Sequence, residues 1–191
     1  FNDNLYKTAM VLFVVYAVYS DPETETVFSA IATGLFIGPF ILVSAIAGQL
    51  ADMRDKAVII RRVKAFEILL MLIGASGLYL AWRGYDLPVN ILGIQTTFPI
   101  ILMLLALFMT GIQSTFLGPI KYAILPQHLK REEVLAGTGL VEAGTYIAIL
   151  LGTILAGWID VEWAALAVVL TAMVGYVAGR QVPPAPPMGE E

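Results

Sequence analysis

The sequence has 191 residues, of which 59% are hydrophobic and 14% are charged, and its net charge is −4. Soluble domains are about 45–50% apolar and about 25% charged, so the composition excludes an ordinary soluble domain and indicates a protein that uses a lipid bilayer as its solvent. The apolar residues form helix-length runs, which argues against an outer-membrane barrel. The absence of cysteine excludes disulfides and thiolate metal sites, and no basic, aromatic-rich patch suggests a nucleic-acid partner.

Six membrane-spanning helices are predicted along the chain. Each run is long enough, at about 1.5 Å per residue, to cross most of a hydrocarbon core about 30 Å thick. Segments rich in charge, proline or glycine separate the runs and end the helices. The expected spans are residues 1–20, 27–51, 57–82, 98–125, 133–157 and 163–179. The predicted fold class is an all-α membrane protein with six transmembrane helices.

The two ends of the chain carry separate expectations. The chain starts at Phe1, and residues 2–4 lead directly into an apolar run, so we expect a fragment that begins within its first helix. The helical bundle is expected to occupy residues 1–180. Residues 181–191 are rich in proline and cannot continue a helix. We expect them to form an extended cytoplasmic linker toward a missing second half.

Glycine and proline within the runs predict where helices pack and bend. Gly34 and Gly38 have the spacing of a close helix contact, and Pro39 follows them directly. We therefore expect close packing and a local bend in the second helix. Gly118 and Pro119 predict a kink in the fourth helix for the same reason.

The basic residues predict the orientation in the membrane. Lysine and arginine gather in the loops after the second and fourth helices and near the C-terminus, whereas the opposite loops carry Arg83 alone. By the positive-inside rule, both ends of the chain are expected to be cytoplasmic. Glu67 is expected to reach the same interface or to pair with Arg62 or Lys64.

Two ionisable residues stand within the apolar runs. Lys121 follows an uncharged stretch over residues 87–120, and Glu142 lies about 14 Å into the fifth helix. Such groups are costly in a bilayer and usually mark a polar cavity or pathway. Each residue has an alternative that stays open. Lys121 could instead extend to the membrane interface, and Glu142 could instead make a structural hydrogen bond between helices. Asp3 has its own alternative, a simple intrahelical pair with Lys7.

The charged turn after the second helix reads Gly-Gln-Leu-Ala-Asp-Met-Arg-Asp-Lys. It resembles the cytoplasmic signature of the major facilitator superfamily at Gly48, Leu50 and Asp52, whereas Asp55 stands where that family has glycine. The resemblance implies that Gly48 lets a helix of the missing half approach closely. It also implies that Asp52 pairs with Arg54 and with the N-terminal dipole of that helix to hold one transport state. An ordinary interfacial charge cluster is the alternative.

Three further motifs resemble the lysophospholipid transporter family within that superfamily. They are Phe-Asn-Asp-Asn at residues 1–4, Gly-Pro-Ile-Lys-Tyr-Ala-Ile-Leu at 118–125 and Gly-Leu-Val-Glu-Ala-Gly-Thr-Tyr-Ile-Ala-Ile-Leu-Leu-Gly at 139–152. The resemblance covers nearly the whole chain and implies the N-terminal six-helix half of a twelve-helix transporter, with two inverted three-helix repeats. Members of the family move lysophosphatidylethanolamine from the outer to the inner leaflet of the bacterial inner membrane. Some are fused to an acyltransferase.

The resemblance also implies a substrate site formed by Asp3, Asn4, Lys121, Tyr122 and Glu142. A zwitterionic headgroup suits such a site, because Asp3 can hold its ammonium group and Lys121 its phosphate. In an empty site the same two side chains could pair with each other. The acyl chain is expected to lie against apolar helix faces or in lipid. No cofactor or metal is expected.

The predicted function is transport of a lysophospholipid by alternating access. The alternatives are a facilitator for another amphiphile or drug, and a membrane module of a fused acyltransferase. The chain itself is not expected to be an enzyme, because its single histidine, His128, lacks an aspartate at the spacing of an acyltransferase motif. The expected partners are membrane lipid, the substrate, the missing C-terminal half and an associated acyltransferase.

Overall fold

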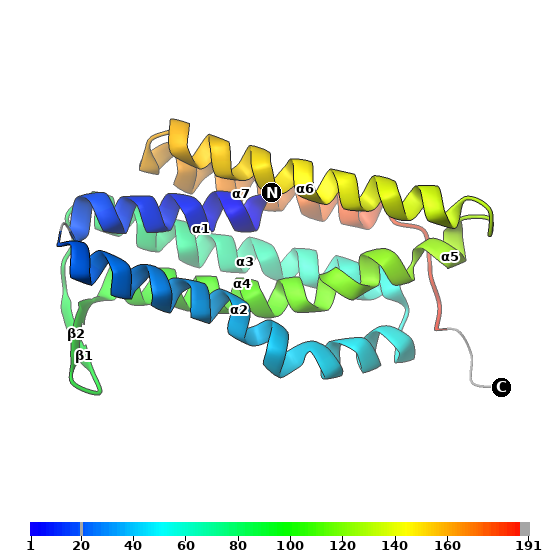
Figure 1. The fold of residues 1–191 in the computed structure, drawn as a ribbon, viewed down its shortest axis with the longest axis horizontal. Coiled ribbons are helices and arrows are strands. Elements are labelled where there is room, and N and C mark those ends of the chain that lie inside the picture. The colour runs from blue at the N-terminus through cyan, green and yellow to red at the C-terminus, as the bar shows by residue number, and fades with distance from the viewer. Residues whose placement is uncertain (20, 188–191) are drawn as a thin grey trace.

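The computed structural model describes residues 1–19 and 21–187. Long helices lie side by side, with a small hairpin at one end of the bundle and the C-terminal segment at the other (Figure 1). The elements in chain order are α1 (Asn2–Phe13), the π-helical turn η1 (Val14–Val18), α2 (Pro22–Met53), α3 (Lys56–Trp82), β1 (Pro88–Ile91), β2 (Ile94–Thr97), α4 (Phe98–Ala123), α5 (Leu125–His128), α6 (Val134–Trp158) and α7 (Val161–Arg180).

Five helices in the described part of the chain are long and apolar enough to cross a membrane, namely α2, α3, α4, α6 and α7. The predicted helical membrane architecture is therefore confirmed for these five spans. The first predicted span corresponds to α1 followed by η1, which together run from Asn2 to Val18. Neither segment reaches the length of the other five, so the sixth span stays a prediction.

The boundary between the first two helices differs from the prediction. Regular α-helix changes to a π-helical turn at Val14, and the predicted end at residue 20 lies outside the described residues. Asp21 then caps α2, because its carboxylate accepts a hydrogen bond of 3.1 Å from the Thr24 N–H. Pro22 suits the first helical position, where no backbone donor is needed. The helix therefore begins five residues before the predicted Val27.

The hairpin of β1 and β2 was missed by the sequence analysis. Its strands pair antiparallel through a two-residue turn at Leu92 and Gly93. Both turn residues have positive φ, 51° at Leu92 and 84° at Gly93, as a type I′ turn requires. The side chain of Asn90 accepts a hydrogen bond of 3.1 Å from the Gly93 N–H. The available signal was the β-branched residues on both sides of Gly93.

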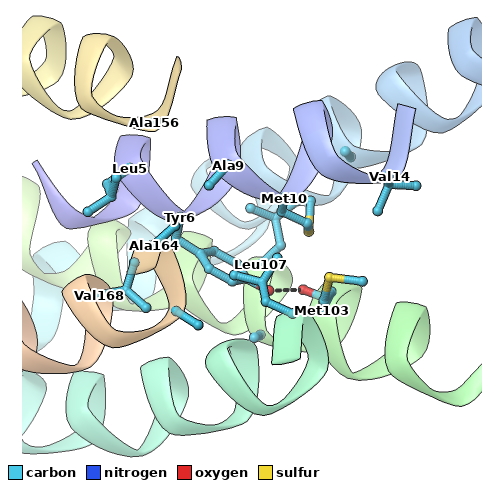
Figure 2. Packing of buried hydrophobic residues seen from close by; sticks show 14 of the residues in the cluster. Leu5, Tyr6, Ala9, Met10, Val14, Met103, Leu107, Ala156, Ala164 and Val168 are labelled. Carbon is cyan, nitrogen blue, oxygen red and sulfur yellow. Dashed lines mark hydrogen bonds between the residues drawn. The ribbon is translucent and has the colours of Figure 1, made fainter. Parts of the chain in front are cut away.

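The main core surrounds α1, which packs against α6 and α7. Leu5, Tyr6 and Met10 of this helix are fully buried. The Tyr6 hydroxyl donates a hydrogen bond of 2.6 Å to the backbone oxygen of Met103 on α4 (Figure 2). A buried hydroxyl without a partner would be costly, so this bond sets both the depth and the rotation of α1.

The close contact of α2 is made elsewhere than predicted. A Cβ on Gly34 or Gly38 would meet no described atom within 4 Å, so the expected contact at these glycines does not form within the described part of the chain. A Cβ on Gly111 of α4 would instead lie 2.6 Å from the backbone oxygen of Phe36 and 3.1 Å from the Pro39 ring. The predicted bend of α2 is visible in Figure 1, where its second half diverges from α4, as an internal proline favours.

The C-terminal segment is extended and docks on the end of the bundle. Ala185 is fully buried, and its N–H donates a hydrogen bond of 3.0 Å to the Asp55 carboxylate. The Lys56 N–H donates to the Ala185 oxygen at 2.9 Å, and the Gln127 side chain donates to the Pro186 oxygen at 2.7 Å. Residues 181–187 thus form a strap that joins the α2–α3 turn to α5.

We predict that Gly74→Ala destabilises the bundle by about 1–3 kcal/mol, as overpacking does. A Cβ at this position would lie 2.5 Å from the ring of Tyr6, whose hydroxyl bond leaves the ring little freedom to move. Thermal unfolding of the purified protein in detergent measures the effect. Gly34→Ala, which places the same methyl group in open space, is the matched control. Equal melting temperatures for the two variants would contradict the packing described.

A second prediction concerns the pH dependence of the strap. The N–H of Ala185, then that of Ala57, hold the pKa of the Asp55 carboxyl below its ordinary value. A lowered folded-state pKa stabilises the protein above the unfolded pKa of about 3.9, and this contribution is lost as the pH falls through the folded pKa. Asp55→Asn should therefore lower the melting temperature at pH 7, and the difference from wild type should shrink below pH 4.

The control for this prediction is Asp52→Asn, since Asp52 is exposed and lies in the same turn. A melting-temperature difference between Asp55→Asn and wild type that stays constant from pH 7 to the acid limit would contradict the prediction.

Candidate functional site

A cavity of about 580 Å³ lies among α1, α2, α4 and α6, and Lys64 of α3 reaches its wall. Three residues predicted from the motifs, Asp3, Asn4 and Lys121, line this cavity together. The other lining residues are Phe1, Phe36, Phe40, Lys64, Gln113, Ser114, Leu117, Gly118, Val141, Gly144, Thr145, Ala148 and Ile149. The cavity therefore combines charged groups with an extensive apolar wall.

Asp3 is held by α4 rather than by its own helix. Its carboxylate accepts a hydrogen bond from the Ser114 hydroxyl. The alternative pair with Lys7 does not form among the described residues. The Lys7 ammonium lies instead over the Phe36 ring, 4.8 Å from its centroid, an arrangement that favours a cation. The carboxylate of Asp3 is thus directed to the cavity between α1 and α4.

Lys121 bridges α4 and α6. Its ammonium donates a hydrogen bond of 3.0 Å to the Thr145 hydroxyl and lies 5.2 Å from the centroid of the Tyr122 ring. The lysine is half-buried at the cavity wall. Tyr122 lies beside the cavity and is not among its lining residues.

Glu67 is buried behind the cavity, with only 3% of its surface exposed. Its carboxylate forms an ion pair of 2.9 Å with Lys64 and accepts bonds of 3.1 Å from the Gln113 and Asn2 side chains. The predicted pairing with Lys64, one of the alternatives for Glu67, is confirmed. Because a buried carboxylate needs charged or hydrogen-bonding partners, the network draws α1, α3 and α4 together.

The remaining predicted residues lie away from this cavity. Glu142 is exposed on α6 and does not line it. Asp52 and Arg54 are also exposed, and no ion pair joins them in the described chain. A Cβ on Gly48 would meet no described atom within 4 Å. These four positions therefore face outward from this bundle.

Several cavity residues were missed by the sequence analysis. Ser114 stands seven residues before Lys121, which places both on one helical face. Thr145 lies within the quoted fifth-helix motif, three residues after its glutamate. Lys64 was predicted as a partner of Glu67, three residues away, and not as a residue of the cavity. Helical spacing from the predicted residues was thus the signal that could have found them.

The wall of the cavity combines charged, polar and apolar side chains. Among the described residues, no group of three or more histidine, aspartate or glutamate side chains converges to hold a metal ion. The wall offers one carboxylate, Asp3, and two ammonium groups, Lys64 and Lys121, beside hydroxyl and amide groups. Aromatic and aliphatic side chains cover the rest. Such a combination fits an amphiphile with a charged head and an apolar chain.

Curated relatives support the resemblance seen in the motifs. The chain is 28% identical over 182 residues to the protein named Lysophospholipid transporter LplT of Citrobacter koseri, and 29% identical over 182 residues to the protein of that name of Salmonella newport. Both comparisons cover 92% of this chain and 37% of the relative. The chain thus spans little more than a third of the length of these relatives, which are named as transporters and not as enzymes.

No family model matches the chain, and no solved structure matches it. The predicted resemblance to lysophospholipid transporters is nevertheless confirmed by the named relatives. Together with the five apolar helices, it identifies the chain as part of a multi-pass membrane protein.

The Glu67 network makes a stability prediction. Glu67→Ala leaves the Lys64 ammonium without its partner inside the bundle and should cost about 3–5 kcal/mol, whereas Lys64→Met with Glu67→Leu removes both charges and should cost much less. Unfolding in detergent, followed by circular dichroism, measures both variants. Glu142→Ala is the control, because this glutamate is exposed. If Glu67→Ala were as stable as Glu142→Ala, the network would not support the fold.

Proposed function

We propose that this chain forms the N-terminal six-helix half of a lysophospholipid transporter. The observation that carries the proposal is the single cavity in which Asp3, Lys64 and Lys121 share a wall with aromatic and aliphatic side chains. The relatives named as lysophospholipid transporters support the same substrate class. The cavity thus supports an amphiphilic ligand, and the names of the relatives support a lysophospholipid as that ligand.

The charge balance of the site favours a zwitterionic headgroup. The two ammonium groups of Lys64 and Lys121 are matched by the two carboxylates of Asp3 and Glu67. A headgroup with one positive and one negative charge, such as phosphoethanolamine, leaves this balance unchanged. In the proposed complex, Asp3 binds the ammonium group of the substrate and Lys121 binds its phosphate.

The two charged side chains that would bind the headgroup have neutral partners in the structure. Asp3 and Lys121 do not pair with each other among the described residues and are held by the hydroxyl groups of Ser114 and Thr145. The headgroup would replace these neutral partners with charged ones, and hydrogen bonds between charged groups are stronger. Asn4 and Tyr122 would complete the polar rim.

The acyl chain is proposed to lie along the apolar part of the wall. Phe36 and Phe40 of α2 face this space together with Val141 and Ile149 of α6. The carbon chain gains about 0.8 kcal/mol for each methylene removed from water, but the lipid bilayer offers it a similar environment. The headgroup contacts should therefore decide which amphiphile is selected.

The pattern of helix packing supports an inverted three-plus-three repeat. An inverted repeat would exchange α1 with α4, α2 with α6 and α3 with α7. Under this exchange the contact between α3 and α4 becomes the contact between α7 and α1, and the contact between α2 and α4 becomes the contact between α6 and α1. The α3–α7 pair maps onto itself. The five main contacts thus form a set that the exchange leaves unchanged, as expected for a transporter half of the major facilitator type.

The distribution of charge supports an orientation with the C-terminal segment in the cytoplasm. The α2–α3 turn, α5 and the C-terminal segment lie at one end of the bundle, and the hairpin lies at the other (Figure 1). The first end carries Arg54, Lys56, Lys130 and Arg131, whereas Arg83 lies near the hairpin. By the positive-inside rule, we propose that the first end faces the cytoplasm. We propose that the membrane is a bacterial inner membrane.

Alternating access and inward transport of the lipid complete the proposal. Gly48 and Asp52 face outward at the cytoplasmic end, where a helix of the second half could dock on them. Glu142 faces outward from α6 in the same way and would border the cavity once the second half is in place. This arrangement gives each of the three a role that requires the rest of the transporter.

The proposal predicts that Lys121→Ala and Asp3→Ala each lower uptake of labelled lysophosphatidylethanolamine by about tenfold or more, the expected loss of one charged hydrogen bond. Uptake by spheroplasts that express the full-length protein is the measurement, corrected for the amount of protein in the membrane. Lys130→Ala, a lysine in an exposed loop, is the matched control.

Normal uptake by both site variants would contradict the site. Wild-type uptake that an uncharged drug-like amphiphile inhibits better than a lysophospholipid would contradict the substrate class and favour a facilitator for other amphiphiles.

A further inference from the structure

A second space of about 700 Å³ lies on the other side of α4, in a groove among α2, α3 and α4. It lies where the second half of α2 diverges from α4 (Figure 1). One face of α3 forms its floor, at the helical spacing of three and four residues: Val58, Ile59, Arg62, Val63 and Phe66. Ile112 and Phe116 of α4 form the far wall. The interior of the groove is therefore mainly apolar.

The charged end of the groove has an unbalanced positive charge. Arg54 and Arg62 line it, and both are exposed. The one lining carboxylate, Asp55, already accepts the N–H groups of Ala57 and Ala185. Neither guanidinium group forms an ion pair within the described residues. Arginine binds phosphate in a fork of two hydrogen bonds, so this end suits an anionic phosphate group.

The dimensions of the groove match one leaflet of a bilayer. From Asp55 to Phe66, α3 advances by about 16 Å, which is about half of a hydrocarbon core about 30 Å thick. The arginines stand at the end of the bundle where the basic residues gather, and the apolar wall extends from them toward the middle of the membrane. The groove can thus hold the headgroup of one lipid molecule at the end of the bundle and its acyl chain toward the middle of the membrane.

We propose that this groove binds an anionic phospholipid from the leaflet at the strap end of the bundle. Its phosphate group lies between Arg54 and Arg62, and one acyl chain follows the apolar face of α3. The lipid fills the space that the bend of α2 opens. The site is distinct from the central cavity, although Gln113 lines both spaces and forms the wall between them.

The test is lipid binding to the full-length protein, measured by native mass spectrometry from detergent. Phosphatidylglycerol and phosphatidylcholine with the same acyl chains are added separately. We expect phosphatidylglycerol to be retained preferentially by wild type, and Arg62→Gln to weaken its binding about fivefold, as one arginine at a membrane surface contributes. Arg83→Gln, which removes an exposed arginine at the other end, should bind like wild type.

A second variant tests the apolar part of the groove. Val58→Trp places a large ring at an exposed position of the lining and should reduce the retention of phosphatidylglycerol without removing charge. Melting temperatures of the variants without added lipid confirm that each one folds.

Three results would overturn the proposal. Equal retention of the two lipids by wild type would show that the groove has no preference for an anionic headgroup. Equal loss in Arg62→Gln and Arg83→Gln would place the effect outside the groove. Displacement of phosphatidylglycerol by stoichiometric lysophosphatidylethanolamine would assign the groove to the transported substrate. None of these results depends on transport activity, so the proposed function stands or falls separately.

Discussion

The buried carboxylate of Glu67 is the constraint on which the centre of the bundle depends. An isolated charge in an apolar bundle would be prohibitively costly, so three side chains from three helices converge on it: Asn2, Lys64 and Gln113. Asn2 also donates to the backbone oxygen of Val168 at 3.0 Å, which brings α7 into the same network. This convergence holds the Lys64 ammonium at the cavity wall. The contacts that compensate the charge of Glu67 therefore also position Lys64 at the candidate site.

Close helix packing around this network leaves the cavity on one side of α4 and the groove on the other. The Tyr6 hydroxyl fixes α1 against α4, and the absence of a side chain at Gly111 lets α2 approach α4 near Phe36. The second half of α2 then separates from α4 (Figure 1), and Pro39 is the proline inside α2. The contact near Phe36 thus closes the space between α2 and α4, and the bend of α2 opens the groove.

The cavity and the groove show two ways of placing positive charge in a membrane protein. In the cavity, Lys64 and Lys121 are balanced by carboxylates and suit a ligand without net charge. In the groove, the arginines have only the engaged carboxylate of Asp55 beside them and suit a ligand with net negative charge. The strap contributes to this difference, because the Ala185 N–H occupies the Asp55 carboxylate. In the two proposals, the transported lipid and the lipid of the groove therefore differ in the charge of the headgroup.

The sequence by itself determined the membrane class, five of the helical spans and the approximate bounds of most of them, because long apolar runs and helix-ending residues act locally. It also identified Asp3, Asn4 and Lys121, which line one cavity. Local patterns could not show that Glu67 lies inside the bundle, that Ser114 and Thr145 hold the two charged side chains, or that Ala185 docks on Asp55. These contacts join residues that are up to 130 positions apart. Only the tertiary structure decided them, because the partner of a charged side chain depends on which helix faces it.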